Sequence, residues 1–177
     1  EVIDFPRYED NDYGKLVGRY LKGEFGSMES LSPYLIALTY AGDRALAKPL
    51  IEKWLAEGKL VIANRYVPSN KAFSAARMSP KEGREFIDWD DKLEYETNKI
   101  PREDLVLLLY VDPKVIQQNV DQKEVRGYMG KKARDIHEAN FEYQKKVAKM
   151  YLQLAKSEDH WHIVQCMQGK TMRSREE

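Results

Sequence analysis

The chain has 177 residues, which is enough for one compact domain with a full core. Hydrophobic residues make up 42% and charged residues 33% of it, as is ordinary for a globular protein, and no apolar run approaches the roughly 18 residues that a membrane span requires. Its 29 basic and 29 acidic residues balance, so the overall charge gives no reason to expect binding to a nucleic acid polymer or an anionic membrane.

The first elements are a short strand and an amphipathic helix. The apolar stretch at 2–5 predicts a strand end that Pro6 breaks. From Tyr13 on, apolar residues recur at helical spacing, and Gly23 follows the last of them. The residues of this stripe are Leu16, Val17, Tyr20 and Leu21.

Two further helical patterns follow, with their boundary expected near 40–44. Their apolar positions are Leu31, Tyr34, Leu35 and Leu38, then Leu46, Leu50, Ile51, Trp54 and Leu55, with Gly58 at the end. The run at 60–63 contains β-branched residues and predicts a strand buried on both faces, as in parallel sheets.

The second half repeats the alternation of helix and strand. Residues 80–98 are polar and predicted to be helical, and 105–111 is the strongest buried-strand signal, which Asp112 and Pro113 end while opening the next helix. A long helix is predicted at about 133–156, and a last strand at 161–166. The single cysteine, Cys166, cannot form an internal disulfide, which favours a reducing compartment, most simply the cytoplasm.

This order predicts an α/β fold, with a central parallel sheet flanked by helices in three layers. We expect residues 1–177 to form a single domain. In such folds ligands bind beyond the carboxyl ends of the strands, so the residues there are the first candidates for a site.

An arginine next to aromatic residues follows each of the first two strands. Arg7 comes after Phe5 and Pro6, and Arg65 lies between Asn64 and Tyr66. A guanidinium binds phosphate oxygens in pairs, so two of them at one sheet edge could hold a phosphate monoester. The alternative for either is an ordinary surface salt bridge.

Tyr40 and Arg44 are the next candidates. They lie one helical turn apart, so the ring could stack on a base while the guanidinium donates to a carbonyl of that base. The alternative is that Tyr40 belongs to the core and Arg44 is a solvated helix charge.

A basic segment at about 122–136 is the third candidate. Its glycines, Gly127 and Gly130, suggest a lid, and phosphoryl transfer needs positive charge and exclusion of water around the transferred group. The alternative is a solvated basic loop. Its cations are Lys123, Arg126, Lys131, Lys132 and Arg134.

Taken together, these residues resemble the thymidylate kinases, within the nucleoside monophosphate kinase branch of P-loop proteins. The resemblance extends over nearly the whole chain and includes features beyond the candidates above. These are Gly23-Glu24, Ser69 with Ala72 and Phe73, Asp104-Leu105-Val106 and the segment 135–138.

The resemblance implies ATP and Mg²⁺, and a role for each matched residue. Arg7 and Arg65 would bind the phosphate of dTMP, with Arg65 also catalytic. Tyr40 would stack on thymine, Arg44 would donate to a thymine carbonyl, and Phe5, Tyr66, Asn70 and Phe73 would complete the acceptor pocket. Arg126 and Arg134 would be catalytic lid residues, with Lys131 and Lys132 beside them. A homodimer is also implied, and no metal ligand is assigned.

Two features depart from the family pattern. No Gly-x-x-x-x-Gly-Lys-[Ser/Thr] loop is present, although the family has it just before the segment that starts at Glu1, so we expect the chain to be truncated at both ends and to lack its first strand. Asn64 stands where the family usually has aspartate, and it keeps the shape but not the charge.

The leading hypothesis is therefore phosphoryl transfer from ATP to dTMP, giving dTDP and ADP. The alternatives are a related nucleotide or deoxynucleoside kinase, and a non-catalytic homologue that binds nucleotide. Arginines at both strand ends favour a monophosphate acceptor, because a nucleoside offers them no phosphate.

Overall fold

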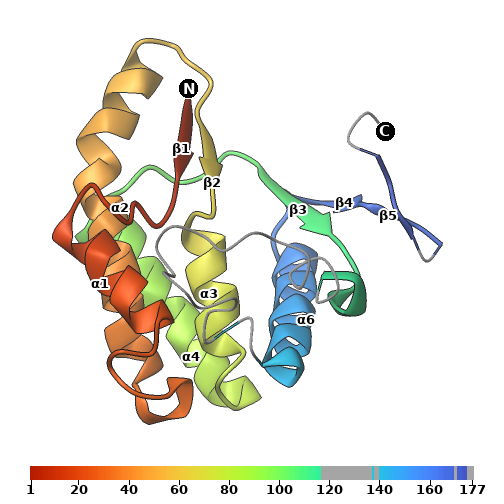
Figure 1. Ribbon diagram of the computed structural model, residues 1–177. Helices are drawn as coiled ribbons and strands as arrows, with labels where there is room; N and C mark the ends of the chain where they lie inside the picture. The colour runs from red at the N-terminus through yellow and green to blue at the C-terminus, as the bar shows by residue number, and fades with distance from the viewer. Residues whose placement is uncertain (117–136, 138–139, 170, 175–177) are drawn as a thin grey trace. The chain divides into compact units, whose positions relative to one another are not determined.

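The computed structural model describes residues 1–116, 137, 140–169 and 171–174. The chain divides into two compact units, Glu1–Arg102 and Glu103–Glu177. Each unit contains a pair of parallel strands together with helices, so the predicted α/β class is confirmed (Figure 1).

In the first unit, β1 (Val2–Asp4) and β2 (Ile62–Asn64) run parallel and side by side (Figure 1). Ile3 pairs with Ala63 and Asp4 with Asn64, so both strands end at the same edge. The backbone N–H of Phe5 donates to the Asn64 carbonyl at 3.0 Å and extends the pairing beyond the last register pair. The segments that follow the two strands therefore leave from one place.

The helices of the first unit have clear local causes. Asn11 caps α1 by accepting from the Gly14 N–H, and Ser79 and Glu82 form a capping box at the start of α4. Helix α3 begins with Val67 and Pro68 directly after β2 and was not predicted as a helix. The bounds are α1 (Asp12–Leu21), η1 (Met28–Ser30), α2 (Pro33–Ala56), α3 (Val67–Ala75), α4 (Pro80–Asp91) and the π-helical η2 (Lys92–Thr97).

Helix α2 corrects the prediction of two helices with a boundary near 40–44, because it runs unbroken through that point. The core-facing stripe also differs, since small residues such as Ala37, Ala41 and Ala47 are buried. The leucines lie on the other side of the helix and are 40–64% exposed. They are Leu35, Leu38, Leu46, Leu50 and Leu55.

The prediction that the second strand is buried on both faces is wrong for β2. It begins at Ile62, whose side chain is exposed, while Ala63 points inward with Ile3. The inner face of the strand pair packs against Ala47 and Ile51 of α2, so α2 covers one face only. Of the apolar run at 60–63, therefore, only the residues on the face towards α2 are covered.

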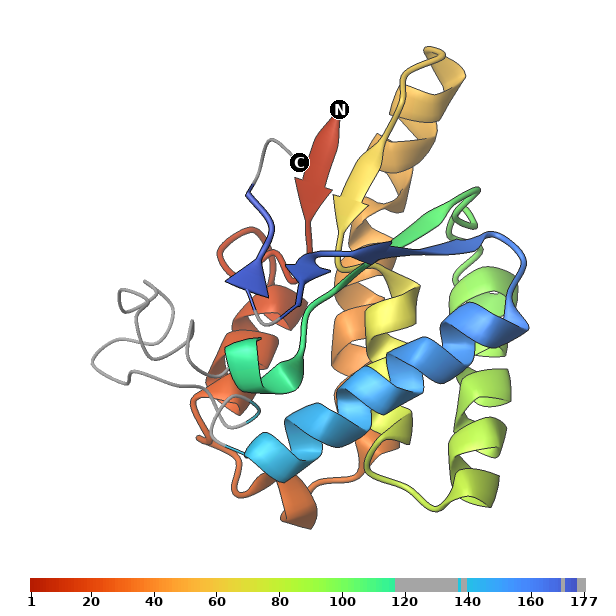
Figure 2. The ribbon, with the colours of Figure 1, turned by 90° about the vertical axis from the view of Figure 1, so that its right-hand side faces the viewer.

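The second unit contains β3 (Val106–Tyr110) and β4 (Trp161–Gln165), which are parallel and in register from Val106 with Trp161 onward, beside α6 (Phe141–Ser157) (Figure 2). An antiparallel pair, β5 (Met167–Gln168) and β6 (Thr171–Met172), follows and was not predicted. As expected, Asp112 opens the next helical turn, because its side chain accepts from the Lys114 N–H.

Two predictions for this unit need correction. Helix α6 begins at Phe141 rather than near 133, because Asn140 caps it by accepting from the Tyr143 N–H at 3.0 Å. Strand β3 is covered on one face only, and Leu107 and Leu109 are exposed on the other. Among the described residues, no helix is both long and apolar enough to cross a membrane.

Candidate acceptor site

The shared edge of β1 and β2 brings together the two segments that carry the predicted phosphate-binding arginines. Arg65 follows β2 immediately, and Arg7 follows β1 after the Phe5–Pro6 bond. Their side chains have different surroundings, because Arg65 is exposed and Arg7 is mostly buried against α2. The first unit thus presents one exposed arginine and one anchored arginine at the same edge.

Asp43 of α2 anchors Arg7 by three hydrogen bonds. The backbone N–H of Arg7 donates to Oδ2 at 2.8 Å, its Nε donates to Oδ1 at 2.9 Å, and an Nη nitrogen donates to the Asp43 carbonyl at 2.8 Å. The Asn11 amide is a third donor to the Asp43 carboxylate, at 2.6 Å from Oδ1. Because Asp43 is only 1% exposed, this ion pair is shielded from water and fixes the loop after β1.

A glycine makes this anchoring possible. A Cβ on Gly14 would lie 1.9 Å from the Arg7 carbonyl oxygen, so only glycine lets the start of α1 approach the loop this closely. Asn11 links the two elements, since it caps α1 and also binds Asp43. The position of Arg7 is therefore set jointly by α1 and α2.

Arg65 has a left-handed backbone with φ of 62°. This conformation is uncommon for a residue with a Cβ, and such residues concentrate at functional sites. The guanidinium carbon lies 5.3 Å from the centre of the Phe73 ring, so α3 supports the side chain through a cation–π contact. Beside it, the Asn64 amide donates to Asp4 Oδ1 at 2.8 Å.

Arg44 is not a solvated helix charge. Its Nε donates to Glu94 Oε1 at 2.9 Å, and an Nη nitrogen donates to the same oxygen. The two side chains are 2% and 0% exposed. Burial alone would lower the pKa of Arg44, but the Glu94 carboxylate outweighs it, and the pKa is raised.

Asn70 is buried one turn before Phe73 on α3. Its Nδ2 donates to Asp90 Oδ1 at 2.8 Å and to the Ala37 carbonyl at 3.5 Å. Burial raises the pKa of Asp90 to about 7, with Arg44 opposing this rise and Glu94 adding to it. Asp90 Oδ2 and Glu94 Oε2 are buried without a hydrogen bond within the described part of the chain.

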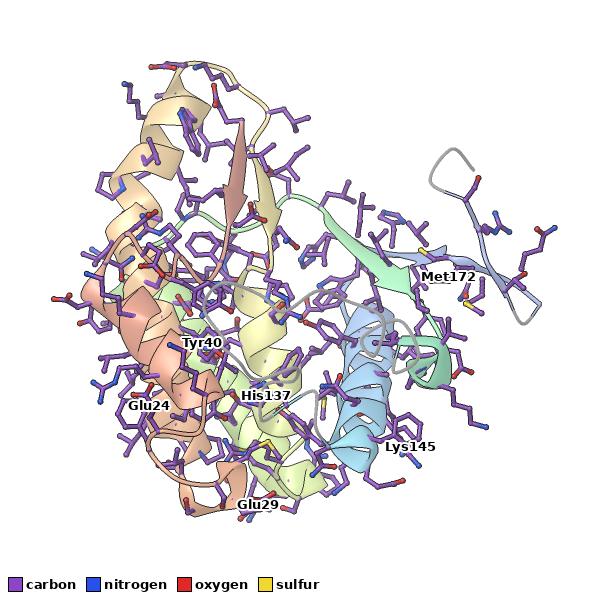
Figure 3. All side chains as sticks on the ribbon, in the orientation of Figure 1. Glu24, Glu29, Tyr40, His137, Lys145 and Met172 are labelled. Atoms are coloured by element: carbon purple, nitrogen blue, oxygen red, sulfur yellow. The ribbon has the colours of Figure 1, made fainter. Side chains whose placement is uncertain are left out.

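The other predicted acceptor residues surround this cluster. Tyr40 lies half-buried on α2, one turn before Arg44 (Figure 3). Phe5 is 4% exposed and packs on Tyr66, with ring centroids 5.8 Å apart, while the Tyr66 hydroxyl donates to the Pro101 carbonyl at 2.9 Å. Phe5 and Tyr66 therefore support the core beneath the edge, and their predicted contact with substrate stays a prediction.

The lid residues Arg126, Lys131, Lys132 and Arg134 lie outside the described residues, as does the lid segment as a whole. His137, from the family-like segment 135–138, is buried against the Tyr143 ring in the second unit. That unit also has an open hollow of about 290 Å³, whose lining includes Lys114, Lys145 and Lys149 and none of the predicted site residues. Lys145 projects from α6 (Figure 3).

Sequence reasoning missed three acidic residues that organise the site: Asp43, Asp90 and Glu94. Asp43 lies between the candidates Tyr40 and Arg44, and a carboxylate next to a candidate arginine could have prompted a search for an ion pair. Asp90 and Glu94 lie in a polar segment, and no local pattern distinguishes them from solvated helix residues.

Comparison with known proteins identifies relatives of this chain. The thymidylate kinase family model matches residues 2–174. A thymidylate kinase of Mycobacterium tuberculosis is 31% identical over 154 residues, which cover 87% of this chain and 71% of the relative. A probable thymidylate kinase of Pyrococcus horikoshii is 31% identical over 169 residues, which cover 94% of this chain and 74% of the relative.

A solved structure of thymidylate kinase from Candida albicans has the same fold. It superimposes with a TM-score of 0.69 at 24% sequence identity, over 97% of this chain and 73% of that one.

Proposed function

This chain belongs to the thymidylate kinase family, and we propose that it transfers a phosphoryl group from ATP to dTMP, giving dTDP and ADP. The observation that carries the proposal is the edge of β1 and β2, where Arg65 stands exposed in a left-handed backbone beside the anchored Arg7. Phosphoryl transfer needs positioning and positive charge rather than covalent chemistry from the protein, and this edge supplies both.

The two arginines would act differently on the phosphate of dTMP. Arg65 is exposed and rests on Phe73, so its guanidinium is available to bind phosphate oxygens. Arg7 already has a buried carboxylate partner in Asp43, so it would add fixed positive charge and a preformed loop. We therefore propose Arg65 as the principal phosphate ligand and as a catalytic residue.

The base would lie against α2 and α3. Tyr40 offers a ring for stacking, Arg44 a donor for a carbonyl, and Asn70 with Phe73 the remaining wall of the pocket. The support for these roles is that the three polar groups come from adjacent turns of neighbouring helices, and that Arg44 and Asn70 are already fixed by hydrogen bonds.

The donor is ATP, with Arg126, Lys131, Lys132 and Arg134 as the proposed lid. At the edge of β1 and β2, the exposed Asp4 carboxylate and the Asn64 amide offer oxygen donors, and Mg²⁺ in kinases is held by few carboxylates together with substrate phosphates. The donor set thus fits Mg²⁺, which would neutralise phosphate charge. Asn64 is uncharged where the family has aspartate, so we propose Asp4 as the main carboxylate ligand.

The leucine stripe of α2 supports a homodimer, because Leu35, Leu46 and Leu50 are exposed on the side of the helix that faces away from its buried residues. An L46E/L50E variant should be monomeric by light scattering where the parent is dimeric, and an unchanged mass would exclude this face.

We also propose a cytoplasmic location, in keeping with Cys166, which is a free thiol.

Arg65→Ala tests the proposed acceptor site. Losing a charge-assisted phosphate contact of about 1.5–3 kcal/mol should raise the Michaelis constant for dTMP by about tenfold to a hundredfold. Arg84→Ala is the matched control, because Arg84 is exposed on α4 and its loss changes the net charge equally. An unchanged Michaelis constant and rate in Arg65→Ala would remove Arg65 from the site.

A further inference from the structure

The side chains proposed to read the base are held in place by residues on another element. Arg44 belongs to α2 and Asn70 to α3, yet the carboxylates that bind them, Glu94 and Asp90, both come from the α4–η2 segment. We propose that Glu94 and Asp90 are positioning residues, which set the direction of Arg44 and Asn70 and so determine which pyrimidine is accepted. This inference rests on the proposed function.

The hydrogen bonds fix Arg44 in a particular direction. Glu94 accepts from Nε and from one Nη nitrogen through a single oxygen, Oε1. A guanidinium held along that side can rotate little, and its other N–H donors point elsewhere. Those donors suit a carbonyl oxygen of a base rather than an amino group.

The amide of Asn70 is oriented in the same way. Its NH₂ group donates to Asp90 Oδ1 and to the Ala37 carbonyl, so the amide oxygen is turned away from both. An oxygen facing a ligand accepts from a ring N–H. Together with the donors of Arg44, this gives a donor–acceptor pattern that matches thymine or uracil and opposes cytosine, which has an amino group and an unprotonated ring nitrogen.

Stability alone does not account for this cluster. Two carboxylates lie one turn apart at 0% exposure, and each has an oxygen without a hydrogen bond in the described part of the chain. Burying such charges costs free energy, and apolar replacements of similar volume are often neutral or stabilising. The π-helical η2 adds irregular geometry, which is frequent at functional sites.

Glu94→Gln is the direct test, because it keeps the shape and an acceptor oxygen but weakens the bonds that depend on charge. We expect the Michaelis constant for dTMP to rise about tenfold while that for ATP stays within about twofold. The preference for dTMP over dCMP, measured as the ratio of kcat/KM values, should fall. Asp91→Asn is the matched control, since Asp91 lies in the same segment but pairs with Lys71 at 2.6 Å.

A merely structural role gives a different result. It would lower the melting temperature and leave both the dTMP Michaelis constant and the dTMP-to-dCMP ratio of folded enzyme unchanged, and that outcome would overturn the inference. If Glu94→Gln does not fold, Asp90→Ala decides, because it removes the acceptor of the Asn70 amide and leaves the Arg44–Glu94 pair in place. It should relax the same ratio, and an unchanged ratio would overturn the inference.

The parent protein separates this inference from the proposed function. If it phosphorylates dTMP and the variants behave like Asp91→Asn, the positioning role fails and the proposed function stands. If the parent fails to phosphorylate dTMP, the proposed function fails, and the positioning role falls with it.

Discussion

Asp90 should make the stability of the protein depend on pH in a way that Asp90→Asn abolishes. Burial raises the pKa of its carboxyl from 3.8 to about 7, against the opposing charges of Arg44 and Lys71 and with the like charges of Glu94 and Asp91. The folded protein therefore holds this proton more tightly than the unfolded chain. The stabilising contribution is complete below about pH 4 and is lost as the pH rises towards 7.

The size of the effect follows from the shift. A change of about 3 pKa units, from 3.8 to about 7, corresponds to on the order of 4 kcal/mol, at about 1.4 kcal/mol per unit. Asparagine cannot titrate, so the free energy of unfolding of Asp90→Asn should be equal to or lower than that of the parent near pH 5. Towards pH 8 the parent loses the Asp90 contribution and the variant does not, so the difference should shift in favour of the variant by a few kcal/mol.

Urea unfolding at several pH values between 5 and 8 measures this difference. Subtracting the two free energies of unfolding removes the titrations that parent and variant share. Asp88→Asn is the matched control for replacing a carboxyl by an amide, because Asp88 is exposed on the same helix. Parallel pH profiles for the parent and Asp90→Asn would show that the Asp90 carboxyl is ionised normally, and the reasoning would be wrong.

Three further predictions concern the edge of β1 and β2. Asn64→Asp should leave folding intact and give equal or higher activity on dTMP, and a fall in activity would count against the proposed use of this edge. Gly14→Ala should lower the free energy of unfolding by about 1–3 kcal/mol in urea titrations, because its Cβ would clash with the Arg7 carbonyl. Gly58→Ala is the comparison, because nothing lies within 4 Å of a Cβ added at Gly58, and it should cost only about 1 kcal/mol of backbone strain. Equal losses of unfolding free energy at Gly14 and Gly58 would contradict the clash at Gly14. Asp43→Ala should raise the Michaelis constant for dTMP severalfold, since Arg7 loses its anchor, and an unchanged constant would make that ion pair purely structural.

The sequence predicted the arrangement of the strand ends because the signals there are local. Apolar runs bounded by Pro6 and by Asn64 locate the strands, and parallel pairing then places Arg7 and Arg65 at one edge. Helical spacing suggested that Tyr40 stacks on a base, and the resemblance to a family supplied the identity of that base and the role of Asn70. Those roles stay proposals, as do the roles of the lid residues.

Burial was harder to predict, because it depends on which elements pack together. The leucines of α2 form the conspicuous helical stripe, yet the buried face combines small residues such as Ala37 and Ala47 with the charged pair partner Arg44. The partners of Arg44 and Asn70 lie in a distant segment that local patterning marks only as polar. Buried ion pairs between helices leave no periodic trace in a sequence, so Glu94 and Asp90 emerged only from the structure.

The most direct test of the account is a phosphorylation assay with ATP and Mg²⁺ across dTMP, dUMP, dCMP and thymidine. We expect the highest kcat/KM for dTMP, with thymidine the poorest substrate because it offers no phosphate to Arg65 and Arg7. A preference for thymidine over dTMP, or no turnover of any of the four, would contradict it.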